Sequence, residues 1–180
     1  SVQIYMPCRN IYFVLLFFAT GFFGCSPDNG EIAGPNKVIY DYSLTDINPS
    51  SVTYGENIGP SYFDNQVTVH YFGYQYWGTC TARVGQLNAL YADLINEGIN
   101  NVKIIAIGKS EYSSASGDWT DEISLPVLID PSPYTTWSNW GVEQRDLFFL
   151  DSDGNYVTDY NISSWDYNKI YTTIIDLSSQ

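Results

Sequence analysis

The sequence predicts one α/β domain, in which a βαβ unit precedes a β-hairpin and a last helix around a central mixed sheet with flanking helices. Two apolar runs, Val67–Phe72 and residues 102–107, are rich in the β-branched and aromatic residues that are typical of buried parallel strands. A segment with helical periodicity joins them. Strand, helix and strand in this order form a right-handed unit whose two strands are parallel.

The helix between these strands is expected at residues 79–97, with Thr79 as its N-cap. Its apolar residues recur at steps of three and four and therefore share one face. They are Val84, Leu87, Tyr91, Leu94 and Ile95. Gly98 follows at the position where many helices end in a left-handed residue. This pattern predicts a helix that packs one side against the sheet.

Turn residues and apolar runs place the remaining elements. The predicted elements are an edge strand at 38–43, a polar loop at 109–120 anchored by Trp119, a strand at 122–130 with Pro126 at its start, a helical turn at 133–140, a hairpin of 147–150 and 156–160 around the turn 151–155, and a helix capped within 164–166. A calcium site at 151–155 is less favoured than a hairpin turn, because the glycine and glutamate of an EF-hand do not fit.

Residues 1–25 have the features of a signal peptide, because Arg9 precedes an apolar run at 11–19. The Gly24-Cys25-Ser26 triplet resembles the end of a bacterial lipobox, in which the cysteine carries lipid. Phe22, three residues before this cysteine, departs from the leucine usual at that position. Residues 26–37 are expected to form a flexible tether, and 38–180 the folded domain. A lipoprotein, an ordinary secreted protein and a retained anchor are three alternatives, and we expect a periplasmic or membrane-anchored bacterial protein.

The composition limits the classes of partner. The chain has 180 residues, of which 44% are hydrophobic and 17% aromatic, enough for one packed core. Its formal net charge is -13, with seven Lys and Arg residues and no basic cluster. Nucleic acid is therefore not an expected partner, since phosphate binding depends on Lys and Arg. One histidine and one domain thiol cannot form a zinc site, and no cofactor is expected.

Cysteine usage points to position 80. Cys8 and Cys25 fall in the predicted leader, so Cys80 is the domain's only thiol and no disulfide is expected within it. It follows a predicted strand by one short aromatic loop and lies in the first turn of the next helix. Helix N-termini stabilise thiolates, most strongly at the first position of the turn, here residue 77.

With these elements in place, the chain resembles thioredoxin-like proteins, and more narrowly the N-terminal domain of selenoprotein P and its bacterial relatives. The resemblance covers residues 67–177. It is carried by Val67-Thr68-Val69, Trp77-Gly78-Thr79-Cys80, residues 101–107, Leu125-Pro126-Val127 and residues 151–155. The family motif is U-x-x-C, with selenocysteine (U) first. The resemblance places Trp77 on the selenocysteine, Cys80 on the resolving cysteine and Pro126 on a cis-proline that faces the motif.

The resemblance implies a thiol or selenol oxidoreductase that acts on protein disulfides or peroxides, and Trp77 has three interpretations. In the first, the redox position is lost and the domain binds protein or peptide partners without catalysis. In the second, Cys80 works alone. In the third, Trp77 is a translated UGA codon that specifies selenocysteine in the cell. Met6 has the context of a natural start, so the sequence looks like an untrimmed open reading frame. The sequence does not specify an oligomeric state.

Two other residues have simpler interpretations. His70, the only histidine, lies within a central strand and is expected to be a core residue whose nitrogens are hydrogen-bonded. Arg83 follows Cys80 by one turn and could add positive charge there, but a solvated position on the helix is the favoured interpretation. No carboxylate lies within Val67–Phe72, so the buried acid of thioredoxins is not evident.

Overall fold

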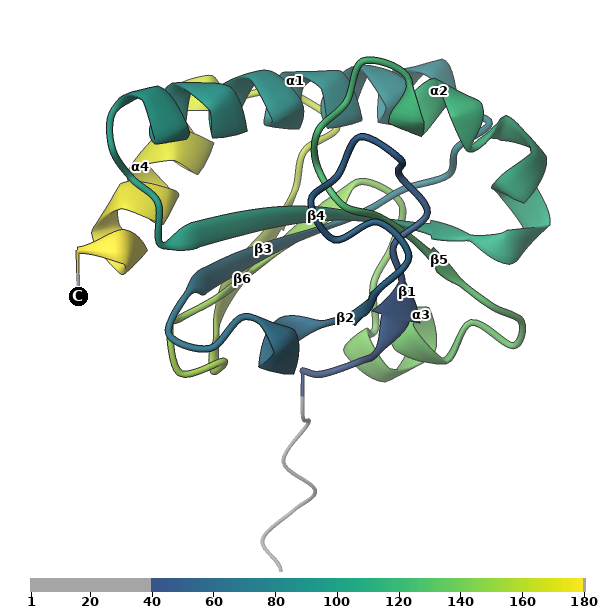
Figure 1. Cartoon of the computed structure of the whole chain (residues 1–180), viewed down its shortest axis with the longest axis horizontal. Coiled ribbons are helices and arrows are strands. Elements are labelled where there is room, and N and C mark those ends of the chain that lie inside the picture. Colours follow the sequence, from purple (N-terminus) through teal and green to yellow (C-terminus); the bar gives the residue numbers. More distant parts are fainter. Residues whose placement is uncertain (1–39, 180) are drawn as a thin grey trace, which may run out of the picture. The chain divides into compact units, whose positions relative to one another are not determined.

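A five-stranded mixed sheet forms the centre of the computed structural model, which describes residues 40–179 (Figure 1). Its strands are β3 (Val67–Phe72), β4 (Val102–Lys109), β5 (Val127–Asp130), β6 (Asp146–Leu150) and β7 (Tyr156–Asn161), in the order β5-β4-β3-β6-β7. β4 is parallel to both β3 and β5, whereas β6 is antiparallel to β3 and β7. The predicted α/β class, with its βαβ and ββα halves, is confirmed.

Helices cover both faces of the sheet (Figure 1). α1 (Gly78–Asn96), α2 (Gly117–Thr120) and α4 (Tyr167–Ser178) contribute to one apolar core, together with the side chains of Val67, Val69 and Tyr71. α3 (Thr135–Trp140) contributes Trp137 and Trp140 to a second core on the other face. All six residues of β3 are buried because both faces are covered. This explains why β3 is rich in β-branched and aromatic residues, and why its two polar residues, Thr68 and His70, are buried as well.

The ends of α1 differ by one or two residues from the expectation. The N-cap is Trp77 rather than Thr79, which lies inside the first turn, and no side chain caps this end. Gly98 has φ +85°, so the predicted left-handed residue after the helix is confirmed. At α4 the predicted cap is also confirmed, because the Asp166 carboxylate accepts a hydrogen bond from the Lys169 N–H.

The first predicted strand is wrong within the described residues. Residues 40–43 pair with no strand, and pairing begins at β1 (Leu44–Thr45), which meets β2 (Asn57–Ile58) ahead of a 3-10 turn at Pro60–Tyr62. The alternation of Tyr40 and Tyr42 reflects packing instead, since both rings contact Trp140 of α3. Residues 38 and 39, and the predicted signal peptide and tether with Cys8 and Cys25, lie outside the described residues.

The segment expected to be a polar loop contains two short helices, a 3-10 helix at Ser110–Ala115 and α2. The expected anchor is confirmed, because Trp119 is fully buried in the core below α1. None of the helices within residues 40–179 is long and apolar enough to cross a membrane.

His70 is the core residue that the sequence predicts. Its Nδ1 shares a 2.7 Å hydrogen bond with the Tyr42 hydroxyl, and its Nε2 shares one of 2.8 Å with Thr68 Oγ1. The imidazole is completely buried, and this burial lowers its pKa to about 3. His70 therefore remains neutral in the folded protein across the physiological range.

The burial of His70 predicts a pH-dependent stability. In the unfolded chain the imidazole takes up a proton below pH ~6.5, whereas in the folded chain it stays neutral down to about pH 3. Because the unfolded state binds the extra proton, the free energy of unfolding should fall by about 2 kcal/mol between pH 8 and pH 5. Urea unfolding at several pH values measures this, and the slope should disappear in His70→Gln. An unchanged slope in that variant would contradict the assignment.

Candidate redox site

The site lies where β3 ends and α1 begins, and a glycine makes the connection possible. The Gly73 N–H donates to the Ile107 carbonyl at 3.1 Å, which continues the β3–β4 pairing by one residue. A side chain on Gly73 would come within 2.9 Å of the Tyr71 hydroxyl and 3.0 Å of the Trp119 ring. Glycine is needed here because the backbone passes directly over these two buried rings.

Gln75 fixes the loop that follows. Its side chain is fully buried, and its amide donates to the Lys109 carbonyl while its Oε1 accepts from the Lys109 N–H, both at 3.3 Å. The side chain thus replaces a neighbouring strand at the end of β4. Gly108 leaves the space for it, since a Cβ there would lie 2.2 Å from Gln75 Nε2.

Aromatic contacts hold Tyr74 beside this loop. Its ring stacks on Trp137, with centroids 5.3 Å apart, and the Lys109 ammonium lies 5.3 Å from its centroid. The same ammonium lies 4.6 Å from Trp137 and 4.8 Å from Tyr134, so it occupies a cage of three rings. Tyr76 and Trp77, by contrast, are 77% and 53% exposed. The loop therefore presents two aromatic side chains to solvent from a fixed base.

Trp77 and Cys80 occupy opposite environments in the same helical turn. The Trp77 carbonyl accepts from the Cys80 N–H at 2.8 Å and from the Thr81 N–H at 3.1 Å. Residue 77 is thus exposed at the N-cap, whereas the Cys80 thiol is completely buried. A nucleophile that meets a partner in solution suits position 77, and a group that acts second suits position 80.

The segment opposite Cys80 is the loop at residues 143–145, before β6. Gln144 Nε2 donates to Cys80 Sγ at 3.3 Å, and the Arg145 N–H donates to the Phe72 carbonyl at 2.7 Å. Arg145 adopts φ +74°, in the left-handed region. Sequence reasoning missed these residues. The strand topology could have revealed them, because β6 is antiparallel to β3 and its start therefore lies beside the end of β3.

Pro126 does not have the expected place or geometry. The cis peptide bond within residues 40–179 is Ser132–Pro133, so the expectation of a cis bond at Pro126 is wrong. Pro126 is buried at the start of β5, and β4 lies between β5 and β3. Two strand spacings, about 10 Å, therefore separate its strand from β3. The N-terminal segment holds this loop: the Asn48 amide donates to the Leu125 carbonyl, and Asp46 Oδ1 accepts from the Val127 N–H.

Arg83 is bonded rather than solvated. The guanidinium is half-buried and donates to the carbonyls of Ile162 at 2.6 Å and Ser163 at 2.5 Å, and to Gln86 Oε1. Arg145 Nε donates to the Ser163 hydroxyl at 2.8 Å. Both cations are thus fixed by neutral groups of the segment after β7, close to the buried end of the site.

Tyr71 supplies the hydroxyl behind the thiol. It is fully buried and donates to the Cys80 carbonyl at 3.5 Å. Burial raises the pKa of Tyr71 strongly, and the neighbouring Cys80 thiol raises it further, while Arg145 and Arg83 oppose the shift. The hydroxyl therefore keeps its proton and remains a hydrogen-bond donor.

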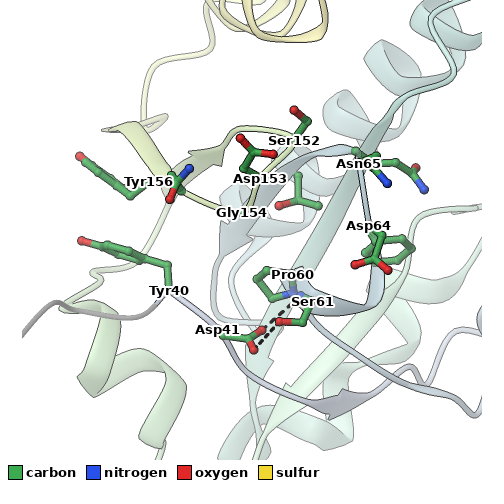
Figure 2. Close-up of a pocket in the computed structure, with 14 residues that line it drawn as sticks. Tyr40, Asp41, Pro60, Ser61, Asp64, Asn65, Ser152, Asp153, Gly154 and Tyr156 are labelled. Carbon is green, nitrogen blue, oxygen red and sulfur yellow. Dashed lines mark hydrogen bonds between the residues drawn. The ribbon is translucent and has the colours of Figure 1, made fainter. Parts of the chain in front are cut away.

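Two cavities differ in their relation to this site. One of about 540 Å³ adjoins it, because Gln144, Tyr74 and Lys109 are among its lining residues. Another, of about 830 Å³, lies at the opposite end of β3 and contains Asp41, Asp64 and Asp153 (Figure 2). Within the described residues, no group of three His, Cys, Asp or Glu side chains could hold a metal ion. The predicted turn 151–155 closes on itself, since Asp151 Oδ1 accepts from the Asp153 and Asn155 N–H groups.

Comparison with known proteins shows the fold. No family model and no curated protein matches the chain. Among solved structures, DsbF of MTB has a TM-score of 0.62 and 14% identity, covering 78% of this chain and 98% of its own. A secreted Mycobacterium tuberculosis disulfide oxidoreductase homologous to E. coli DsbE has 0.57 and 15%, covering 77% and 97%. The exposed lipoprotein thioredoxin Etrx1 of Streptococcus pneumoniae has 0.57 and 18%, covering 76% and 99%.

These likenesses establish a thioredoxin-like fold, as the sequence predicts. They do not show the narrower resemblance to selenoprotein P.

The role of Gln75 leads to a stability prediction. Gln75→Ala leaves the Lys109 N–H and carbonyl without their partner and should lower the free energy of unfolding by about 2 kcal/mol. Hydrogen exchange at residues 74–77 should also become faster, because the loop loses its fixed base. Gln86→Ala, which removes a partly exposed hydrogen bond, is the matched control and should cost under about 0.5 kcal/mol. Equal losses in both variants would mean that Gln75 has no special role.

Proposed function

We propose that this chain is an exported thiol or selenol oxidoreductase whose redox pair is residue 77 and Cys80. Protein thiols and disulfides are its proposed partners. The observation that carries the proposal is the arrangement of the turn: an exposed first position at a helix N-terminus, followed by a buried thiol with a fixed amide against its sulfur. The helix end favours an anion at the first position.

The proposed reaction transfers two electrons in two steps. A selenolate or thiolate at residue 77 attacks a partner disulfide; a bond to one partner sulfur forms, the S–S bond breaks, and the other sulfur leaves as a thiolate. The Cys80 thiolate then attacks residue 77, forms the internal bond and releases the second partner thiolate. The protons lost by residue 77 and Cys80 pass through solvent to the two leaving thiolates. A dithiol reductant restores the pair.

In this proposal residue 77 is selenocysteine, and the tryptophan in the amino-acid sequence is the translation of a UGA codon. An indole has no sulfur or selenium to attack a disulfide, so the step above requires a chalcogen at this position. A selenolate there could also reduce a peroxide. It would take one oxygen as a selenenic acid and release the other as an alcohol or water, after which Cys80 would displace water to form the internal bond.

Export and lipid attachment at Cys25 complete the proposal. Two of the proteins with similar structures are a secreted disulfide oxidoreductase and an exposed lipoprotein thioredoxin, which supports an extracytoplasmic location. The signal-peptide features of residues 1–25 support the same location. A protein that works outside the cytoplasm meets partner disulfides there.

A redox-inactive binding domain is the alternative, and the exposed aromatic residues favour it. Tyr76 and Trp77 project from a loop fixed by Gln75, and large aromatic side chains are frequent binding hot spots. In that case Trp77 is the residue that the cell makes, and it contacts a peptide or protein partner directly.

The geometry of the redox pair can be tested by supplying the missing sulfur. In a chain carrying Trp77→Cys, with Cys8→Ser and Cys25→Ser, mild oxidation should join residue 77 to Cys80 and remove two hydrogen atoms from the intact mass. This variant should catalyse the reduction of a protein disulfide by dithiothreitol. With Cys80→Ser added, and with the partner disulfide supplied without dithiothreitol, the mixed disulfide at residue 77 should accumulate, because no second thiol of the chain resolves it.

Failure to form the internal disulfide, while the fold is retained by circular dichroism, would overturn the proposal. The chain with Trp77 intact is the control and should show no reductase activity. Activity that survives Cys80→Ser in that chain would exclude Cys80 as its source.

A further inference from the structure

We infer that Gln144, which donates to the Cys80 sulfur, and Tyr71, whose hydroxyl donates to the Cys80 carbonyl, form a cradle of two hydrogen-bond donors that stabilises the thiolate resolving the mixed bond at residue 77. The inference rests on the proposed function, since it assigns Cys80 the second step. Both residues act as positioning residues, through the sulfur. Neither residue lies within the motif at residues 77–80.

Burial is the difficulty that such a cradle addresses. The Cys80 side chain has no exposed surface, so water cannot solvate a charge on its sulfur. A resolving cysteine must nevertheless react as the thiolate. The protein therefore has to replace the lost water with donors of its own.

Gln144 is the donor on the solvent side. Its Nε2 donates to Sγ at 3.3 Å, and its side chain also lines the 540 Å³ cavity. It thus lies between the thiol and the cavity. The donated amide hydrogen stabilises the thiolate more than the thiol, because hydrogen bonds to charged acceptors are the stronger ones.

Tyr71 is the donor on the core side. Its hydroxyl bonds to the Cys80 carbonyl at 3.5 Å and also interacts with the thiol. Gly73 creates the space, since any side chain there would contact the same hydroxyl. The hydroxyl stays protonated at physiological pH, so it can turn its hydrogen toward the sulfur when Cys80 ionises.

The positive charges near the cradle also favour the Cys80 thiolate. Arg83 of α1 and Arg145 of the loop before β6 both act on Tyr71, so their positive charge reaches this end of the site. The carboxylates on the surrounding elements are Asp118, Asp121, Glu143 and Asp146. Asp118 and Asp121 line a separate cavity beside Thr81, and Asp146 accepts hydrogen bonds from the Glu143 N–H and the Asn161 amide.

The test is the titration of Cys80 itself in the full chain carrying Cys8→Ser and Cys25→Ser. The 13Cβ chemical shift of Cys80, followed by NMR as the pH is raised, reports its ionisation. Tyr71→Phe and Gln144→Ala should each raise the midpoint by about one pH unit, the size expected when a donor to a charged group is lost. Gln144→Glu should raise it more, because a carboxylate would then face the sulfur.

Tyr91→Phe is the matched control, since that hydroxyl lies on α1 but bonds to Lys103 Nζ, and the midpoint should not move. Unchanged midpoints in Tyr71→Phe and Gln144→Ala, with the fold retained, would overturn the inference. The measurement needs no partner and no particular residue at position 77. The proposed function can therefore fail while the cradle is confirmed, and the reverse outcome is equally distinguishable.

Discussion

The complete burial of β3 is the constraint on which the site depends. β3 is parallel to β4 on one side and antiparallel to β6 on the other, with an apolar core on each face. Because of these pairings, the start of α1 and the loop before β6 must meet at the end of β3. The same pairings bring Cys80 and Gln144, 64 residues apart in sequence, within hydrogen-bond distance. The site is therefore a consequence of sheet topology more than of any local motif.

Rigid support distinguishes the buried half of the site from the exposed half. Gln75 and Gly108 attach the loop to β4, Gly73 passes over Tyr71, and Arg83 ties α1 to the segment after β7. The Tyr76 and Trp77 side chains extend from this base into solvent. Groups fixed in this way lose little freedom when a partner binds, which favours either catalysis or tight recognition at position 77. The fold alone is compatible with both functions, so the chemistry of one residue decides between them.

The sequence predicts much of the fold because most of its signals are local. The β-branched and aromatic residues of β3, the periodicity of α1, the glycine after α1 and the Asp166 cap all act within a few residues, and each is confirmed. The errors concern residues whose role depends on distant contacts. Tyr40 and Tyr42 alternate as in a strand but pack on Trp140, and Arg83 finds carbonyls near residue 162. The strand predicted at 122–130 is shorter, since β5 begins at Val127, directly after Pro126. The loop that faces Cys80 is the one before β6, and the strand order is needed to find it.

Peptide mass spectrometry of the natural protein can establish whether position 77 carries a chalcogen in the cell. The protein should be purified from its own host, alkylated and digested, so that the peptide containing residues 77–80 can be sequenced by fragmentation. We expect an alkylated selenocysteine at residue 77, with the isotope pattern of selenium, and a UGA codon in the gene. An unmodified tryptophan at residue 77, encoded by UGG, would contradict it and leave the binding domain as the function that the site supports.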